Sequence, residues 1–259
     1  MSIVERVQDA YGGIDRWRRL KGFTAHVSIS GVALPPPDGR PPAGLSHVTV
    51  RSYSLPTAPR PKPSLRELVV EGDTATPRLR IYGSTDLDRC CWYTPERVEF
   101  HDAAGHLLQA QDEPLAGLKA RPSGAPFNQL ERGYMFGALV WEAIAGPFLL
   151  SHAEARVSAG LEVSQGDGMQ TRLAVEWPQS LSPLAPRKVL YLSRSGHLVR
   201  SDCALDSLGF GAVIDTISAP VDFQGIQVST LRRICARGES DEPASSPLID
   251  IEIFDVRFH

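Results

Sequence analysis

The chain has little cysteine and no excess of positive charge. Its four cysteines include the adjacent pair Cys90 and Cys91 and no C-x-x-C spacing. We therefore expect reduced thiols rather than a disulfide framework. The 27 basic residues are outnumbered by 30 acidic residues. Because no extended basic surface is available to neutralise phosphates, nucleic acid is not an expected partner.

The sequence also lacks an uninterrupted apolar run of the kind that inserts into a membrane. Residues 133–150 have about the right length, but Glu142 lies inside them and Gly146-Pro147 interrupts them near the end. We expect a buried helix there and no stable membrane insertion. Glu5, Arg6 and Asp9 stand where a signal peptide needs an apolar core, so a cytoplasmic location is expected.

Motifs for common catalytic chemistry are missing. The chain has no G-x-S-x-G elbow, no phosphate-binding glycine motif and no H-x-x-x-H or H-E-x-x-H spacing. His152 and Glu154 are two residues apart and would meet on one face only in an extended segment. We therefore expect no metal and no cofactor.

What the sequence does have is strand patterning. Apolar and polar residues alternate over 25–30, 46–53, 171–177 and 248–258, which is typical of strands with one buried face. With shorter candidates these make about a dozen strands with few helices between them, which favours antiparallel pairing in a barrel, half-barrel or sandwich. Proline-rich segments such as 35–42 and 178–186 are interpreted as loops. We expect a single domain over 1–259.

Two helices stand apart from the strands. Residues 2–20 carry apolar side chains at helical spacing, with a break at Gly12-Gly13. A second helix, from about 128 to 145, is apolar on most of its circumference. Such a helix must be covered either by the protein core or by a ligand.

Two stretches, 98–109 and 189–200, share an apolar run, a polar cluster and Gly-His-Leu. Asp102 to Gly105 and Ser193 to Gly196 are turn sequences, so both stretches are interpreted as β-hairpins. His106 and His197 then lie at two separate hairpin tips, and we do not expect them to form a functional pair.

Several stretches resemble a known family: 141–150, 190–203 and 224–233. They are similar to segments of the half-barrel superfamily of the bacterial lipoprotein carriers LolA and LolB, and more closely to a group of signal-less actinobacterial proteins of that type. The resemblance implies a mainly β (α+β) fold, a curved antiparallel half-barrel whose helices cover the concave face and enclose an apolar cavity. At Ala219-Pro220-Val221 the group often has Asp-His-Arg, so any role of that histidine is not shared.

Two functions remain open on these grounds. The first is binding of a hydrophobic small molecule that is lipid-, polyketide- or terpenoid-like. The side chains expected to line its cavity are Tyr134, Met135, Phe136, Trp141, Phe148, Arg51 and Tyr191. The alternative is a cofactor-free cyclase or isomerase of natural-product biosynthesis that uses the same cavity. Its candidate general acids or bases are Asp202, Glu176, His152 and His101.

Two further points stay open. Within 197–203 strict alternation places Arg200 and Asp202 on one face with Leu198, and Ser201 and Cys203 on the other. The sequence does not decide which face lines a cavity, or whether the cavity is filled by the protein's own side chains. It also leaves the oligomeric state open.

Overall fold

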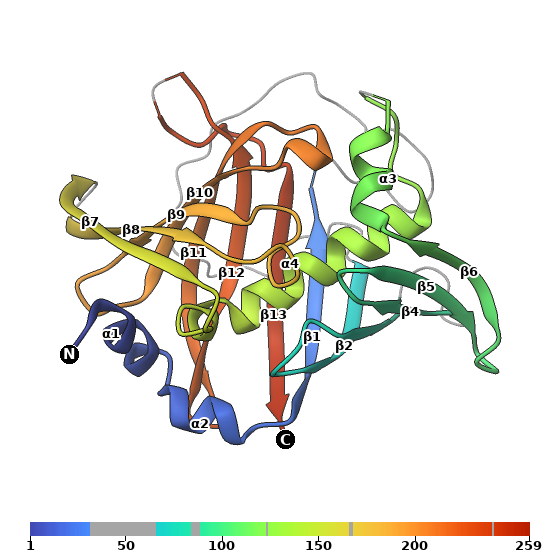
Figure 1. The fold of residues 1–259 in the computed structure, drawn as a ribbon, viewed down its shortest axis with the longest axis horizontal. Coiled ribbons are helices and arrows are strands. Elements are labelled where there is room, and N and C mark those ends of the chain that lie inside the picture. The colour runs from blue at the N-terminus through green and yellow to red at the C-terminus, as the bar shows by residue number, and fades with distance from the viewer. Residues whose placement is uncertain (32–65, 84–88, 123, 166–167, 240) are drawn as a thin grey trace, which may run out of the picture.

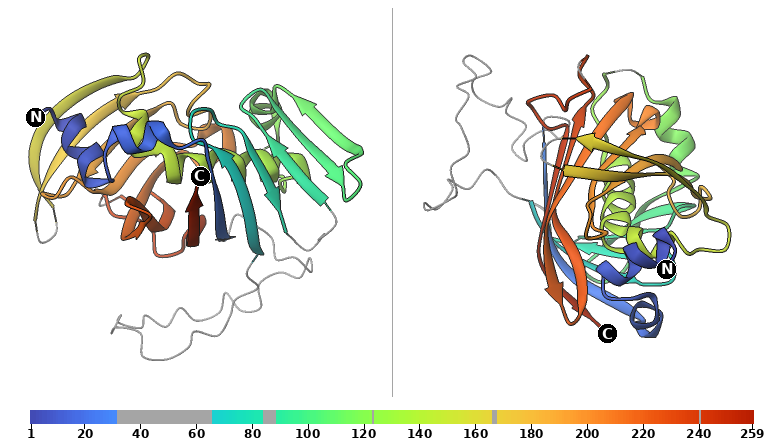
Figure 2. Two further views of the ribbon diagram at one scale, coloured as in Figure 1. Left: turned by 90° about the horizontal axis from the view of Figure 1, so that it is seen from below. Right: turned by 90° about the vertical axis from the view of Figure 1, so that its left-hand side faces the viewer.

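The computed structural model describes residues 1–31, 66–83, 89–122, 124–165, 168–239 and 241–259. Arg51 and the strand expected over 46–53 lie outside the described residues. Within them, thirteen strands form one sheet in which every neighbouring pair is antiparallel. The sheet is curved and does not close on itself, as Figures 1 and 2 show, and the prediction of a mainly β half-barrel is confirmed.

The strands follow the chain as two meanders. Their bounds are β1 Gly22–Ser30, β2 Arg66–Asp73, β3 Leu79–Tyr82, β4 Arg89–Tyr93, β5 Arg97–Asp102, β6 Leu107–Asp112, β7 Arg156–Gln165, β8 Gly168–Glu176, β9 Arg187–Leu192, β10 Leu198–Ala204, β11 Ala212–Phe223, β12 Ile226–Ala236 and β13 Ile249–Phe258. The first meander runs from β1 to the edge strand β6, and the second runs from the edge strand β7 to β13. The two meanders join where β1 pairs with β13.

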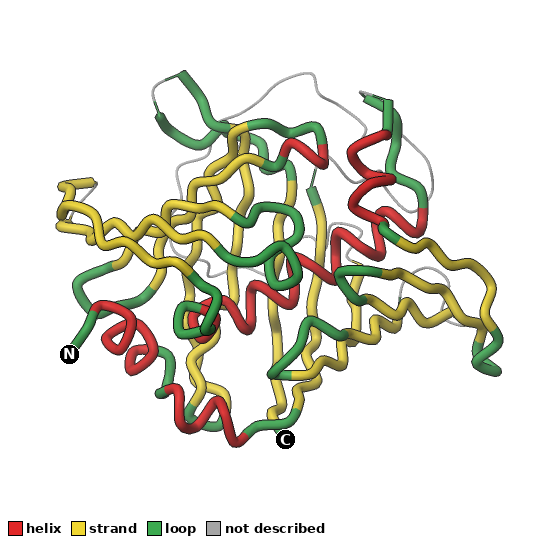
Figure 3. Tube along the Cα trace, viewed as in Figure 1, coloured by secondary structure: helices red, strands yellow, loops and turns green. Residues whose placement is uncertain are grey.

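This order explains why a helix lies inside the curve. The chain between β6 and β7 has to connect the two edges of the sheet, and it contains α3 (Pro114–Ala120) and α4 (Gln129–Leu149). Thirteen strands laid flat would span about 58 Å. The 21 residues of α4 reach only about 31 Å. The curl brings the two edges within reach, and α4 crosses the concave side of the sheet (Figures 1 and 3).

The N-terminal segment forms two short helices, α1 (Ile3–Ala10) and α2 (Ile14–Arg19). Ser2 and Glu5 cap the start of α1 with reciprocal hydrogen bonds. Gly12 and Gly13 separate the helices with φ angles of 104° and 91°, which other residues rarely adopt. The indole of Trp17 in α2 stacks on Phe148 near the end of α4, with 4.2 Å between ring centroids. The N-terminal helices therefore cover the C-terminal half of α4.

The helix α4 forms the centre of the core. Asn128 and Glu131 cap its N-terminus, and nearly all of its residues are buried. Gly133 and Gly137 let it approach β4 closely, because a Cβ atom at Gly137 would overlap the ring of Tyr93. The interpretation of 133–150 as a buried helix is confirmed. In the part of the chain that the structure describes, no helix is long and apolar enough to cross a membrane.

Both Gly-His-Leu stretches are hairpins, as predicted. The Asp102 carboxylate accepts hydrogen bonds from the backbone N–H groups of Ala104 and His106, at 2.9 and 2.8 Å. The hairpins β5–β6 and β9–β10 belong to opposite halves of the sheet, so His106 and His197 do not meet. His106 is exposed, whereas His197 is half-buried against the ring of Tyr11, because α1 packs on this hairpin.

Candidate functional site

Four charged side chains meet between α4 and the sheet. We call them the buried charge cluster: Glu142 on α4, Lys188 on β9, Asp215 on β11 and Arg232 on β12. Glu142 pairs with Lys188 through Oε1, accepts a 3.0 Å hydrogen bond from the hydroxyl of Ser182, and lies 3.7 Å from Nη2 of Arg232. Arg232 donates from Nε to Asp215 Oδ2 at 3.0 Å. The cluster fastens α4 to three strands.

The ion pairs favour the charged forms of Glu142, Lys188 and Arg232 although these side chains are buried. Burial by itself would raise the pKa of the Glu142 carboxyl, but Lys188 and Arg232 outweigh it and hold that pKa below its ordinary value. Burial likewise opposes the charge on Lys188 and Arg232. Glu142 raises the pKa of Lys188, and Asp215 and Glu142 raise that of Arg232. Two positive and two negative charges offset one another.

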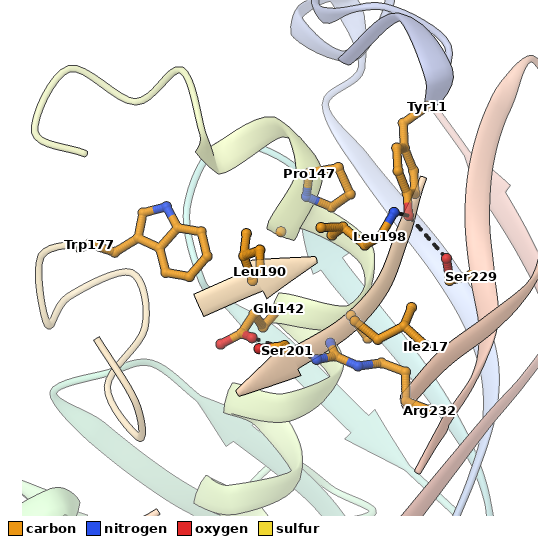
Figure 4. A pocket seen from close by; sticks show the side chains of 12 residues that line it. Tyr11, Glu142, Pro147, Trp177, Leu190, Leu198, Ser201, Ile217, Ser229 and Arg232 are labelled. Atoms are coloured by element: carbon orange, nitrogen blue, oxygen red, sulfur yellow. Dashed lines mark hydrogen bonds and ion pairs between the residues drawn. The ribbon is translucent and has the colours of Figure 1, made fainter. Parts of the chain in front are cut away.

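A small cavity lies next to this cluster, under the C-terminal half of α4 (Figure 4). Its volume is about 20 Å³, which is room for about one water molecule. The polar part of its wall comes from Tyr11, Glu142, Ser201, Ser229 and Arg232. The resemblance implied an enclosed apolar cavity. Here side chains of α4 occupy the concave side of the sheet, and the wall of this cavity is partly polar.

Hydroxyl groups complete the cavity wall. The phenol of Tyr11 lies 3.1 Å from the Ser229 hydroxyl and accepts a 3.2 Å hydrogen bond from the N–H of Leu198. Burial raises the pKa of Tyr11. Ser201 is only 1 % exposed, and its hydroxyl has no hydrogen-bond partner among the described residues. An unpaired buried hydroxyl is costly, so this group is suited to a partner from outside the chain.

The strand β10 departs from the expected alternation. Leu198 and Ser201 both line the cavity, so the expectation that Leu198 shares a face with Arg200 and Asp202 is wrong. The register shifts between Leu198 and Arg200, where an irregularity in the pairing with β9 reverses the alternation. Ser201 thereby faces inward and Asp202 faces the outer side of the sheet.

Asp202 and Tyr191 accordingly belong to a cluster on the other face of the sheet. The Asp202 carboxylate accepts hydrogen bonds from Arg200 Nε at 2.6 Å and from the Tyr191 hydroxyl at 3.0 Å. Arg237 lies 2.6 Å away from it on the same face. The carboxylate is satisfied by these partners, and neither Asp202 nor Tyr191 lines the cavity.

The remaining acid–base candidates also lie away from the cavity. Glu176 is partly exposed at the end of β8, in an ion pair with Arg187 at 3.0 Å. His152 is exposed in the turn after α4. His101 pairs with Glu99 at 2.7 Å and packs beside Trp92. Among the described residues, no group of three His, Cys, Asp or Glu side chains is placed to hold a metal ion.

The apolar candidates on α4 are brought together, but by the protein core. Tyr134, Met135, Phe136, Trp141 and Phe148 are all buried. The Tyr134 hydroxyl donates to the carbonyl of Pro95 at 3.1 Å, and Phe148 stacks on Trp17. Their contacts here are with the chain itself, and a ligand-lining role for them stays a prediction.

The buried charge cluster was not predicted from the sequence, although two features of the sequence pointed to buried charges. A single carboxylate in the apolar segment 133–150 needs a buried partner when that segment is a core helix. Lys188 shares the period-two pattern of Leu190 and Leu192, both buried, which indicates that it points inward. The partners Asp215 and Arg232 depend on strand pairing, which the sequence pattern does not show.

Comparison with solved structures supports the fold. The chain is similar to a LolA superfamily protein from Nitrosomonas europaea, with a TM-score of 0.50 and 8 % sequence identity. The match covers 99 % of this chain and 92 % of that protein. A protein described as an outer membrane lipoprotein-sorting protein domain, from Vibrio parahaemolyticus, matches with the same TM-score, identity and share of this chain, and with 91 % of its own length covered. No family model and no curated protein matches the sequence. The chain therefore has a LolA-like fold.

Proposed function

We propose that this protein binds a hydrophobic small molecule, lipid-, polyketide- or terpenoid-like, between α4 and the concave face of the sheet. The observation that carries the proposal is the cavity under the C-terminal half of α4, whose wall holds a buried hydroxyl without a partner among the described residues. The LolA-like fold supports a site between α4 and the sheet, because α4 lies on the concave side of the curved sheet.

The C-terminal turn of α4 is the part that can make room. Pro147 cannot donate to the carbonyl of Ala143, so this turn has one helical hydrogen bond fewer. The rest of the helix is held firmly, by Glu142 in the buried charge cluster and by the close contact of Gly137 with Tyr93. We expect residues 143–150 to shift while the helix up to Glu142 stays in place.

Such a shift is needed because the cavity holds only about one water molecule. An apolar chain would enter beside Pro147, Leu190 and Ile217, which line the cavity. A shift of the turn costs the stacking of Phe148 on Trp17 and the hydrogen bond from Trp177 to the carbonyl of Leu149. Burial of the ligand offsets these lost contacts, at about 25 cal/mol per Å² of apolar surface. Binding of a long-chain ligand and movement of the turn are therefore coupled.

The alternative function, a cofactor-free cyclase or isomerase, has less support. It requires a group that exchanges a proton with the ligand. Glu142 is the carboxylate that lines the cavity. Its pKa is held below the ordinary value by Lys188 and Arg232, against the effect of burial, which makes it a weak base. The site is better suited to holding a molecule than to transforming one.

Quenching of tryptophan fluorescence tests the proposal. Trp177 lines the cavity and donates through Nε1 to the carbonyl of Leu149 at 3.2 Å, so it reports on both the site and the end of α4. A monoacylglycerol with two bromine atoms in its chain, a contact quencher, should reduce the emission of the wild-type protein in a saturable way. The unbrominated compound should bind without this loss.

Two variants locate the quenched residue. Trp177→Phe should lose most of the quenching. Trp92→Phe should retain it, because Trp92 is 41 % exposed on the outer face of the sheet, beside His101 and Arg80. No saturable quenching, or quenching that depends on Trp92, would refute binding at this site.

A further inference from the structure

We infer that the site selects a ligand whose head group is a neutral oxygen function, a hydroxyl or a carbonyl, rather than a charged group. The inference rests on the proposed function and names the chemistry of the end of the ligand that lies in the cavity. Three properties of the wall carry it: its balance of charge, its hydroxyl groups and its size.

The charges beside the cavity are already balanced. Glu142 and Asp215 offset Lys188 and Arg232, and each of these side chains is at most 12 % exposed. A charged head group would add a buried charge with no counterion, which is strongly unfavourable. An anion would in addition face Glu142, and Oδ1 of Asp215 is already buried without a partner among the described residues.

The hydrogen-bonding groups suit a single neutral oxygen. The Ser201 hydroxyl can donate to a carbonyl oxygen or accept from an alcohol, and the Tyr11 and Ser229 hydroxyls lie in the same wall. The cavity has room for about one water molecule, so one such oxygen atom can take the place of that water. An alcohol, or one hydroxyl of a glycerol head group, can place a single neutral oxygen there, whereas a sulfate or trimethylammonium group cannot enter without its charge.

The experiment compares head groups on one chain. Oleyl alcohol and monooleoylglycerol are neutral, whereas oleyl sulfate and oleyltrimethylammonium carry permanent charges. Each compound competes against the brominated monoacylglycerol in the Trp177 quenching assay. We expect the neutral compounds to bind at least about tenfold tighter than either charged compound.

Matched variants assign the preference to the cavity. Ser201→Ala should lower the affinity for oleyl alcohol about fivefold, since one neutral hydrogen bond is lost, and should change the affinity for oleyl sulfate little. Ser207→Ala is the control, because the Ser207 hydroxyl is also buried without a partner among the described residues but does not line the cavity. It should leave both affinities unchanged. Gly146→Ala adds a methyl group to the cavity wall and removes no hydrogen bond, so it should weaken the binding of the neutral and the charged compounds alike.

The outcomes separate the two claims. Equal or tighter binding of a charged compound overturns the inference on the head group and leaves the binding function standing. An unchanged preference in Ser201→Ala also overturns it. Failure of all four compounds to compete, together with no quenching by the brominated probe, overturns the proposed function itself.

Discussion

Lys188 on β9 and Glu142 on α4 form an ion pair inside the half-barrel, with 6 % and 12 % of their side chains exposed. The pair joins the second meander to the helix that crosses the concave side of the sheet. Arg232 and Asp215 extend it to β12 and β11. The helix is thus held by charge at its middle and by apolar packing along its length.

Breaking this pair should destabilise the protein strongly. Lys188→Met leaves the Glu142 carboxylate buried with a single, more distant cation, and we expect a loss of about 3 kcal/mol or more in the free energy of unfolding. Urea denaturation followed by circular dichroism measures it. The neighbouring variant Arg187→Met breaks only the exposed pair with Glu176 and should cost under about 1 kcal/mol.

The double variant Glu142→Met/Lys188→Met removes both charges together. It should be more stable than Lys188→Met alone, because no unpaired charge of this pair remains buried. A double variant as unstable as the sum of the two single variants would show that the two side chains act independently.

Acid should weaken the cluster. The pKa of Glu142 in the folded protein lies below its ordinary value, so its contribution is present above that value and is lost as the pH falls through the folded pKa. Between about pH 5 and about pH 3 the wild type should therefore lose more stability than Glu142→Gln does. Carboxylates elsewhere, such as Glu99 and Asp102, titrate in both proteins and cancel in the comparison. Parallel pH curves would contradict the role given to Glu142.

Two glycines of α4 should respond differently to the same change. Gly137→Ala forces a methyl group against the ring of Tyr93 and should cost about 1 to 3 kcal/mol. At Gly146 an added methyl group would meet Glu142 Cγ at ordinary contact distance, but the residue precedes Pro147, whose ring disfavours a helical conformation for any residue with a Cβ atom. Gly146→Ala should therefore change stability by less than about 1 kcal/mol, because this cost opposes the gain in helix propensity. Thermal unfolding of both variants checks this, and similar effects at the two positions would contradict the packing described for α4.

The Tyr11 hydroxyl should matter for stability. Tyr11→Phe leaves the buried N–H of Leu198 without its acceptor and removes the contact with Ser229, at an expected cost of about 1 to 3 kcal/mol. Tyr82→Phe, which removes an exposed hydroxyl bonded to Glu71, should change stability by less than about 0.5 kcal/mol. Equal effects of the two changes would mean that the Leu198 amide finds another partner.

The sheet could be predicted from the sequence because its signals are local. Alternation over 25–30, 171–177 and 248–258 depends only on neighbouring residues and the period of a strand, and β1, β8 and β13 lie there. The turn formed by Asp102 and Gly105 is likewise predicted from neighbouring residues alone, because it depends on a local side-chain hydrogen bond and a positive φ angle. The antiparallel half-barrel followed from such patterns together with the family resemblance.

The site could not be predicted in the same way, because it depends on long-range pairing. Glu142, Lys188, Asp215 and Arg232 come from four elements that meet only after the sheet has curled round α4. The irregularity between Leu198 and Arg200 reverses the faces of β10, and no sequence pattern marked it. The acid–base candidates were chosen by residue type within strands, and the structure places Asp202, Glu176, His152 and His101 outside the cavity.

A crystal structure with monooleoylglycerol bound is the most direct test of the account. We expect the ligand to lie between α4 and strands β10 to β12, with residues 143–150 displaced and the pair of Glu142 and Lys188 intact. One ligand oxygen should lie within hydrogen-bond distance of the Ser201 hydroxyl. A ligand bound elsewhere on the protein, with α4 unmoved and the cavity unchanged, would contradict the account.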